Sequence, residues 1–253
     1  MFFDTHAHYD SYKFNADRDT VLSSLPALGV DLVVDPGCDE ASSREAIVLS
    51  ERYDYLYAAV GWQPQELKES YYDGALDVIQ ELARHPKVVA IGEIGLDYYW
   101  DTSYNALQHE VLRAQLRMAL ELDLPVIFHD REAHGDSLAI VREFPGVRGV
   151  FHCFSGSAEM AKELIKLGWY LGFDGPVTYK NNRKHKEVLE VCPMERILIE
   201  TDSPYLSPEP HRGTRNHSGN LRYIAEKIGE IKGLSMEETA HVTAENGRRL
   251  FRI

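Results

Sequence analysis

Several features are scarce or missing in this chain of 253 residues. Cysteine occurs only at Cys38, Cys153 and Cys192, and so small and odd a set does not indicate a disulfide framework. No run of about 18 apolar residues occurs, which argues against a membrane-spanning helix. There is no basic and apolar leader at the start, no low-complexity tract and no linker. These absences favour a cytoplasmic protein with one domain spanning residues 1–253.

Basic residues are fewer than acidic residues. The chain carries 27 Lys and Arg against 40 Asp and Glu, which gives a net charge of −13. A protein that grips many duplex phosphates is expected to carry a basic face. The composition therefore argues against extended nucleic-acid binding. It permits contact with a single phosphate at a strand end, because a divalent metal supplies positive charge locally.

What the chain does have is a regular alternation of short apolar runs and longer amphipathic stretches. The clearest helical stretch is Asn105–Leu122, another follows Ser157, and Ser235 with Glu238 forms a capping box that opens the last helix. Such alternation predicts a parallel sheet covered by helices. Eight strands are predicted, at residues 2–6, 30–35, 56–60, 88–93, 125–129, 148–152, 169–173 and 197–202.

Eight strand–helix repeats favour an α/β fold closed into a (β/α)8 TIM barrel. An open doubly wound sheet is the alternative, but its Gly-rich phosphate loop is missing after the first strand, where residues 4–8 read Asp-Thr-His-Ala-His. In a barrel, the C-terminal ends of the strands meet at the face that carries catalysis. Side chains at the predicted strand ends are therefore the first candidates for a functional site.

Residues able to bind a metal stand at these strand ends. His6 closes the first strand and His8 follows two positions later. Both imidazoles can face one ion, because residues i and i+2 of an extended chain point the same way. Imidazole and carboxylate ligands suit zinc, manganese or related ions, and the whole set is large enough for two. The other candidates close the fourth, fifth, sixth and eighth strands: Glu93, His129, His152 and Asp202.

Each of these residues also has a purely structural interpretation. A lone strand-end histidine is usually a hydrogen-bonded group, and a buried carboxylate is usually salt-bridged. Six such residues together argue against that interpretation, because burying so many ionisable groups without a metal is costly. Glu93 is the natural bridge between two ions, since a carboxylate has two oxygens to share. Asp202 can hold one ion and also accept a proton from a bound water.

The motifs around these residues resemble those of the TatD family of metal-dependent hydrolases, which belongs to the amidohydrolase-like barrels and includes deoxyribonucleases. They occur in the family order between residue 3 and Phe251. The resemblance implies a barrel of the metal-dependent hydrolase type, two divalent ions (Zn, Mn or Mg) and the same six ligands. The five motifs are Asp4-Thr5-His6-Ala7-His8-Tyr9-Asp10, Gly92-Glu93-Ile94-Gly95-Leu96-Asp97-Tyr98, His129-Asp130-Arg131-Glu132-Ala133, His152-Cys153-Phe154-Ser155-Gly156 and Glu200-Thr201-Asp202-Ser203-Pro204-Tyr205-Leu206.

Two positions depart from the family pattern. Members usually carry Gly-x-His-Pro after the third strand, whereas Gln63 stands here in place of a histidine that is expected to meet substrate. Glutamine can donate a hydrogen bond, but it cannot carry a proton or a charge. Ser218 replaces the proline of the family's Arg-Asn-x-Pro stretch. These departures leave the predicted ligands unchanged and bear on the substrate.

Candidates for substrate contact are Gln63, Arg131, His211 and Arg212. Either arginine can clamp a phosphate through two parallel hydrogen bonds. The alternative is a solvated arginine or one that caps a helix.

Several neighbouring residues have two interpretations. The aromatic side chains of Tyr98, Tyr99 and Trp100 can stack on a base or pack their own loop. Glu200, two positions before Asp202, is either a partner of a ligand or a buried structural carboxylate. Cys153 is interpreted as a small core residue.

The leading hypothesis is a two-metal hydrolase in which Glu93 and Asp202 are catalytic. The family resemblance implies a TatD-like deoxyribonuclease that cleaves phosphodiester bonds at a single-stranded or frayed DNA end. One alternative is hydrolysis of a small ester, lactone or amide, which the glutamine at position 63 favours. A second is a non-catalytic metal-binding protein, which predicts a missing ligand. No feature indicates a membrane or a protein partner.

Overall fold

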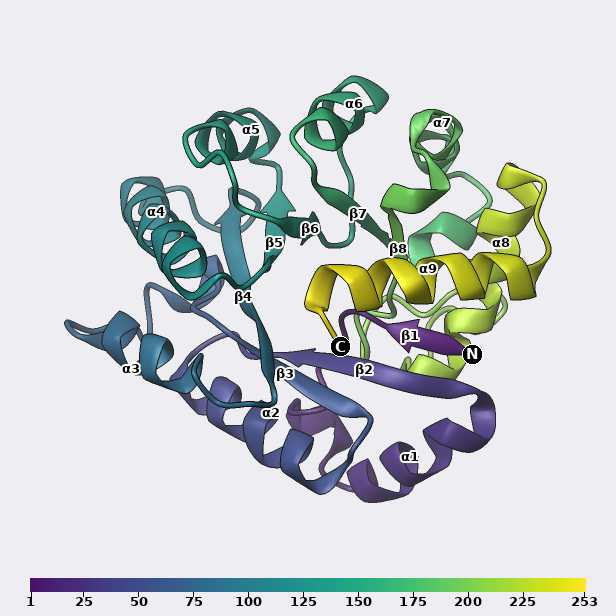
Figure 1. Cartoon of the computed structure of the whole chain (residues 1–253), viewed down its shortest axis with the longest axis horizontal. Coiled ribbons are helices and arrows are strands. Elements are labelled where there is room, and N and C mark those ends of the chain that lie inside the picture. The colour runs from purple at the N-terminus through teal and green to yellow at the C-terminus, as the bar shows by residue number, and fades with distance from the viewer.

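Eight short parallel strands, paired in chain order, form the centre of the computed structural model, which describes residues 1–253 (Figure 1). Every neighbouring pair is parallel, as the strand–helix alternation predicts. The strands are β1 (Phe2–Asp4), β2 (Val30–Pro36), β3 (Leu56–Val60), β4 (Val88–Asp97), β5 (Val126–Arg131), β6 (Gly149–Phe151), β7 (Tyr170–Phe173) and β8 (Ile197–Ile199).

The ring closes between the segments that follow β8 and β1. The Thr5 N–H donates to the carbonyl of Ile199 at 3.3 Å, and the Asp202 N–H donates to the carbonyl of His6 at 2.9 Å. Ala7 forms an isolated parallel bridge with Ser203. The fold is therefore a TIM barrel, and the open doubly wound sheet is excluded.

Helices surround the strands, with one after almost every strand (Figure 1). The long helix predicted at residues 105–122 is observed with the same bounds. The helix predicted after Ser157 is also observed, and the Ser157 side chain caps it by accepting from the Met160 N–H. The helices are α1 (Arg18–Ser24), α2 (Glu40–Arg52), α3 (Ala75–Leu82), α4 (Asn105–Leu122), α5 (His134–Arg142), α6 (Ala158–Lys166), α7 (Arg183–Val191), α8 (Leu221–Lys232) and α9 (Met236–Phe251).

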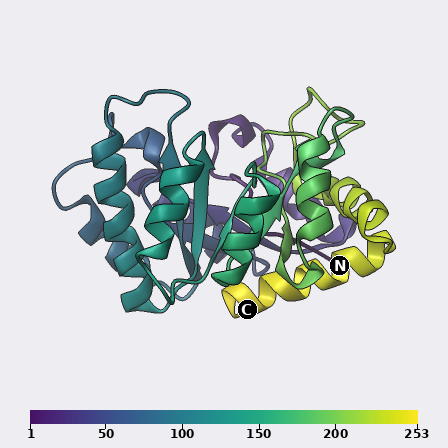
Figure 2. The same ribbon diagram turned by 90° about the horizontal axis from the view of Figure 1, so that it is seen from above.

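The last helix lies across the N-terminal end of the barrel (Figure 2). It opens with the predicted capping box, in which Ser235 and Glu238 exchange side-chain to backbone hydrogen bonds. Further along α9, the Asn246 amide donates to the carbonyls of Met194 and Ile197, which ties the helix to the start of β8. The opposite end of the barrel, where the strands finish, carries the long loops visible in Figure 2.

Aromatic rings fill the space between β5, β6 and the helices outside them. The Phe151 ring stacks on Phe128 with centroids 4.4 Å apart and meets Trp169 edge-on at 5.0 Å. Gly149 lies so close to Trp169 that a Cβ would approach its ring to 2.4 Å. This packing holds β6 rigidly just before His152.

The predicted ends of all five strands that supply candidate ligands need correction. β5 runs on to Arg131, so His129 lies within this strand instead of closing it. β1, β6 and β8 stop before His6, His152 and Asp202, which lie in the connections that follow. β4 continues four residues past Glu93, so this glutamate lies within a strand. The cause is a register shift between Ile91 and Ile94 in the pairing with β5. Such a bulge re-aims a side chain within a continuing strand.

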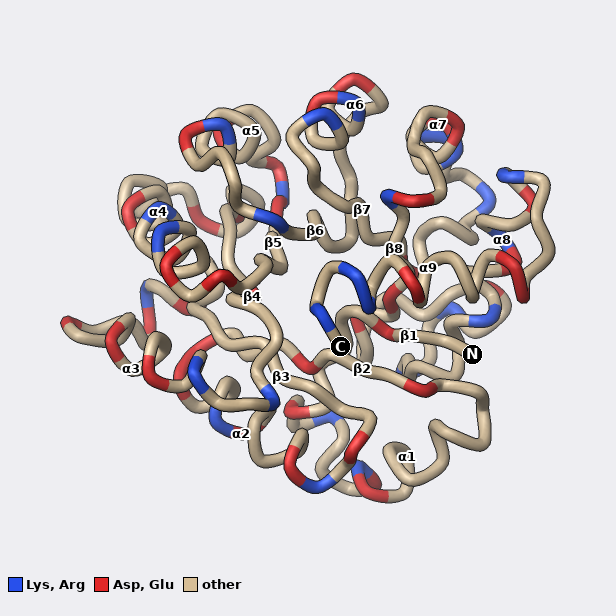
Figure 3. The backbone as a smooth tube through the Cα atoms, in the orientation of Figure 1, with Lys and Arg blue, Asp and Glu red and all other residues tan.

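Charged residues of both signs are interspersed around the outer helices (Figure 3). Basic residues do not gather along one side, in keeping with the net charge of −13. None of the helices combines the length and the apolar character that crossing a membrane requires.

Candidate metal centre

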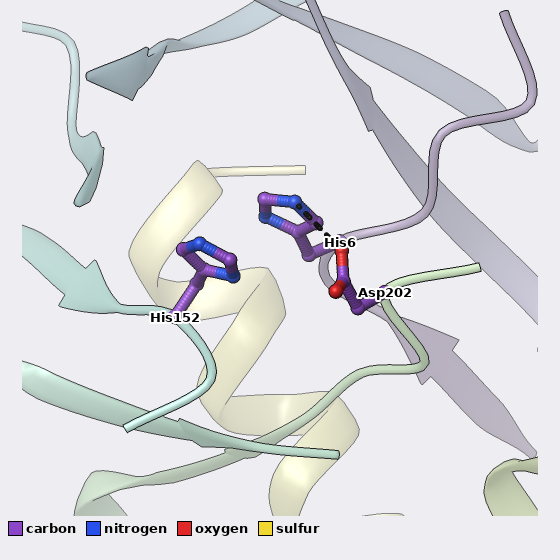
Figure 4. Close-up of side chains that lie close together, drawn as sticks. All are labelled: His6, His152 and Asp202. Carbon is purple, nitrogen blue, oxygen red and sulfur yellow. Dashed lines mark ion pairs between the residues drawn. The ribbon is translucent and has the colours of Figure 1, made fainter. Parts of the chain in front are cut away.

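Four side chains point their polar atoms at one place: two from the segment after β1, one from within β4 and one from the segment after β8. The Nε2 atoms of His6 and His8 lie 3.0 Å apart. Each of them is 3.5 Å from Glu93 Oε2 and 3.6 Å from Asp202 Oδ1. Figure 4 shows His6 facing Asp202, with the His152 ring stacked beside His6. The shared direction of His6 and His8 agrees with extended backbone, since Ala7 between them forms a parallel bridge.

The other oxygen of Glu93 serves a second group. Glu93 Oε1 lies 2.7 Å from His129 Nδ1 and 3.0 Å from His152 Nε2, and these two nitrogens are 3.2 Å apart. The two groups therefore meet at one carboxylate, with one oxygen in each. All six residues predicted from the sequence are brought together, from the ends or interiors of five different strands.

The donor spacings suit divalent cations. Ligands 2.0–2.2 Å from a tetrahedral zinc ion lie roughly 3.3 Å from one another, and adjacent ligands of an octahedral ion lie about 2.9 Å apart. The first group spans 3.0–3.6 Å and the second 2.7–3.2 Å. His6 Nδ1 is buried without a hydrogen-bond partner, so nothing on the protein side prevents Nε2 from carrying the lone pair. The residues therefore fit two ions.

Most of these imidazoles have a partner for the nitrogen that faces away from the centre. His129 Nε2 lies 3.0 Å from Asp97 Oδ2, and the same oxygen accepts from the Gln65 amide at 2.6 Å. His8 Nδ1 lies 3.1 Å from the carbonyl of Pro36. Partners of this kind fix the orientation of a ligating imidazole and raise its basicity.

Glu200 lies behind His152 at ion-pair distance, although His152 Nδ1 forms no hydrogen bond. It is fully buried, with Oε1 3.6 Å from His152 Nδ1 and 2.5 Å from the Cys153 N–H that donates to it. Gly172 makes room for it, because a Cβ there would lie 2.5 Å from Glu200 Oε2. Of the two interpretations of Glu200, the geometry favours the partner of a ligand.

Cys153 is not the core residue that its position suggested. It is half-buried and belongs to none of the apolar clusters. Its φ of 43° turns the chain out of the strand directly after His152, so the alternation of an extended strand no longer applies. The turn lets its N–H reach Glu200.

The cluster is electrically unbalanced without a cation. Burial raises the pKa of Asp202 to about 6. Burial and the neighbouring His152 lower the pKa of His6 well below its ordinary value. For Glu93, burial works in the opposite direction, but His152 and His129 outweigh it and hold the pKa well below the usual range. For His8, His129 and His152, burial lowers the pKa, but neighbouring acidic groups outweigh it and hold the pKa above the ordinary value. These three histidines would have to lose a proton to bind a metal, because an imidazole ligates in its neutral form.

A cavity of about 570 Å³ opens from this centre to solvent. Gln63 and Arg131, two of the four candidates for substrate contact, line it, and the Gln63 side-chain oxygen also accepts from the Gln65 N–H. His211 and Arg212 do not line it. His211 Nε2 pairs with the Tyr223 hydroxyl, and the Arg212 guanidinium lies 4.3 Å from the centroid of the Tyr179 ring.

Sequence reasoning missed several residues of the site. Asp97 stands in a quoted motif, but its role depends on β4 continuing past Glu93. Cys38 follows β2, and its thiol lies 4.0 Å from Glu93 Oε2 with its pKa raised by burial to about 12. Tyr12 and Tyr205 line the cavity from separate loops. Asp97 and Tyr205 fall within the quoted motifs, but the sequence alone assigns neither of them a role, and Cys38 and Tyr12 lie outside every quoted motif.

An eight-stranded barrel whose C-terminal loops gather histidines and carboxylates around one shared glutamate is the architecture of a metal-dependent hydrolase. The family model for TatD related DNase matches residues 3–252. The chain belongs to this family, and it is a metal-dependent hydrolase of the TatD type. Both the resemblance and the barrel predicted from the motifs are confirmed.

Individual relatives cover the whole chain. It is 46% identical to the uncharacterized metal-dependent hydrolase YabD of Bacillus subtilis, over 100% of both proteins. It is 35% identical to the 3′-5′ ssDNA/RNA exonuclease TatD of Citrobacter koseri, over 99% of each. The crystal structure of YjjV, a TatD homologue from Escherichia coli, superposes with a TM-score of 0.93 at 31% identity, covering 100% of this chain and 98% of that one.

Proposed function

We propose that the protein is a two-metal phosphodiesterase that removes nucleotides from an unpaired nucleic-acid end. The observation that carries the proposal is the division of Glu93 between two donor groups at the base of one cavity. His6, His8 and Asp202 would hold one cation with Glu93 Oε2, and the remaining two histidines would hold the other with Oε1. Two such cations would activate water and stabilise the negative charge that develops on oxygen.

Three side chains of the protein would orient the water, accept its proton and bind the substrate. Asp202 has a carboxylate on the cavity wall beside His6 and His8, which suits it to orient the water and accept its proton. Arg131 also lines the cavity and forms no ion pair with an acidic side chain, so its guanidinium is available to a phosphate. Gln63 adds a neutral amide that can hydrogen-bond a phosphate or sugar oxygen.

Two observations support a nucleic-acid substrate. A relative 35% identical over 99% of each chain is a 3′-5′ ssDNA/RNA exonuclease. The net charge of −13 suits an end that enters the cavity better than a duplex lying along the surface. The second candidate is hydrolysis of a small ester, lactone or amide, which the uncharged Gln63 on the cavity wall favours.

The test uses single-stranded oligonucleotides labelled at the 5′ or the 3′ end. Metal-stripped protein receives Mg²⁺, Mn²⁺ or Zn²⁺, and metal content is measured in every sample. The proposal predicts metal-dependent loss of terminal nucleotides, absent in Asp202→Ala and present in the matched variant Asp77→Ala, an exposed change on α3. Full activity in Asp202→Ala at wild-type metal content would contradict the role of Asp202. No cleavage by protein that holds two metals would favour the small substrate.

A further inference from the structure

Exposed aromatic side chains are few in this protein and concentrate at the catalytic end. Five aromatic residues are largely exposed: Tyr12, Tyr72, Tyr99, Trp100 and Tyr205. Four of the five lie in the connections after β1, β4 and β8, the same strands that supply His6, Glu93 and Asp202. A ring left in water costs hydrophobic free energy, so this distribution calls for an explanation by function.

Three of these rings line the cavity above the metal centre. They are 75%, 65% and 43% exposed, for Tyr12, Trp100 and Tyr205 respectively, and we call them the aromatic rim. They come from three separate loops, of which the two that follow β1 and β8 are neighbours. Of the aromatics noted after Glu93, Tyr98 serves the loop, because its hydroxyl is hydrogen-bonded to His109 and Asp136.

Two basic side chains lie next to the exposed rings. The Lys13 ammonium lies 4.1 Å from the centroid of the Tyr205 ring. The Arg131 guanidinium carbon lies 3.9 Å from the centroid of Tyr99 and 5.4 Å from that of Trp100. Neither cation is paired with a carboxylate, although the chain has 40 acidic residues. Rings that offer flat faces, together with free positive charges, match the alternating bases and phosphates of a single strand.

We propose that the aromatic rim binds unpaired bases next to the scissile phosphate, while Lys13 and Arg131 hold the neighbouring phosphates. This inference rests on the proposed phosphodiesterase function and names what selects the substrate. Bases inside a duplex are already stacked on one another, so only a single strand or a frayed end presents free faces to the rim. Stacking on a ring does not distinguish the sugar, so the rim accepts DNA and RNA alike.

The first test measures binding apart from hydrolysis. A fluorescent single-stranded oligonucleotide with phosphorothioate links, which slow cleavage, is titrated with the metal-loaded full chain and followed by anisotropy. We expect Trp100→Ala, Tyr12→Ala and Tyr205→Ala each to weaken binding by about 5- to 150-fold, the range for loss of one stacked base. Trp100→Phe and Tyr12→Phe keep a ring and should bind close to wild type. Tyr72→Ala removes an exposed ring outside the cavity and is the matched control.

The second test separates the rim from the catalytic centre. On methyl p-nitrophenyl phosphate, a small diester without bases, the three alanine variants should keep the wild-type kcat, whereas on the oligonucleotide their KM should rise. Binding that is unchanged in all three alanine variants would overturn the rim while leaving a cleaving enzyme intact. Wild-type protein that holds metal but cleaves neither substrate would instead contradict the proposed function. An equal loss of kcat on both substrates would assign the rings to the centre and also overturn the inference.

Discussion

Replacing Glu200 by glutamine tests whether the buried partner of His152 supports the metal centre. The substitution keeps the size of the side chain and removes its charge. Glu200 has no exposed surface, and its oxygens serve His152 Nδ1 at 3.6 Å, the Cys153 N–H at 2.5 Å and the Thr5 hydroxyl at 3.4 Å. A glutamine oxygen can still accept from Cys153. The charge that favours a proton on His152 Nδ1, and with it a free lone pair on Nε2, is lost.

The expected effect is on metal affinity. Loss of a hydrogen-bonding partner of a ligand typically weakens metal binding by about 10- to 100-fold, or about 1.4 to 2.7 kcal/mol. The separation of 3.6 Å in this structure is longer than a good hydrogen bond. We therefore expect a loss near the lower limit, about 10-fold. Because the donor atoms themselves remain, kcat should return close to the wild-type value at saturating metal.

Competition with a chromophoric chelator measures this affinity directly. Metal-stripped Glu200→Gln and wild-type protein are titrated with Zn²⁺ or Mn²⁺, and Glu187→Gln, an exposed change on α7, is the control. Equal affinities in Glu200→Gln and wild type would refute the role given to Glu200. Activity that stays low at saturating metal would show that the carboxylate acts on the reaction instead of on the ligand.

Three further predictions concern the ions, a close backbone contact and a surface ion pair. Metal at 100 times its Kd stabilises the fold by about 2.7 kcal/mol per site, or about 5.4 kcal/mol for two sites, so Tm should rise by roughly 11 to 22 °C in wild type, and a similar rise in Glu93→Ala would contradict the shared carboxylate. Gly95→Ala would place a Cβ 1.9 Å from the carbonyl oxygen of His129. The variant should therefore lose its native fold and its bound metal, which circular dichroism and metal analysis would measure. Hydrogen bonds from Arg252 and Arg148 lower the pKa of Asp123 to about 2. Because the pKa of Asp123 is lowered in the folded state, the ionised carboxylate stabilises the fold above pH 3.8, and this stabilisation is lost as the pH falls toward 2. The urea midpoints of wild type and Asp123→Asn should therefore converge over this pH range. A constant difference between the two midpoints would count against the ion pairs of Asp123.

The parts of the site that the sequence revealed are those tied to a regular backbone period. Strand–helix alternation predicted eight parallel strands, and strand ends of one direction necessarily meet at one face. His6 and His8 converge because an extended chain repeats every two residues, and that backbone persists beyond β1. Burial of Glu93 and His152 followed from the same argument, since each directly follows or lies within an apolar strand.

Other parts depend on contacts that no local period encodes. The register shift before Ile94 places Glu93 inside β4 and brings Asp97 behind His129, and nothing in the residues themselves reports a bulge. Arg131 and Arg212 looked equivalent as phosphate ligands, yet only the first reaches the cavity. The difference lies in the course of the loop after β8, which the sequence does not constrain.

Strand residues and loop residues also have different roles: the former would determine the reaction and the latter the choice of substrate. The six candidate ligands stand on or directly after strands, whose spacing the barrel fixes, so any chain with this pattern should assemble the same donor groups. Tyr12, Trp100 and Tyr205 stand on loops that the barrel tolerates in many forms. Two relatives with identical donors and different residues at these three positions should therefore share their metal chemistry and differ in the strands they bind. Exchanging the three rim residues between two such chains, with the donors untouched, should transfer the preference for unpaired bases and leave the turnover of a small diester unchanged.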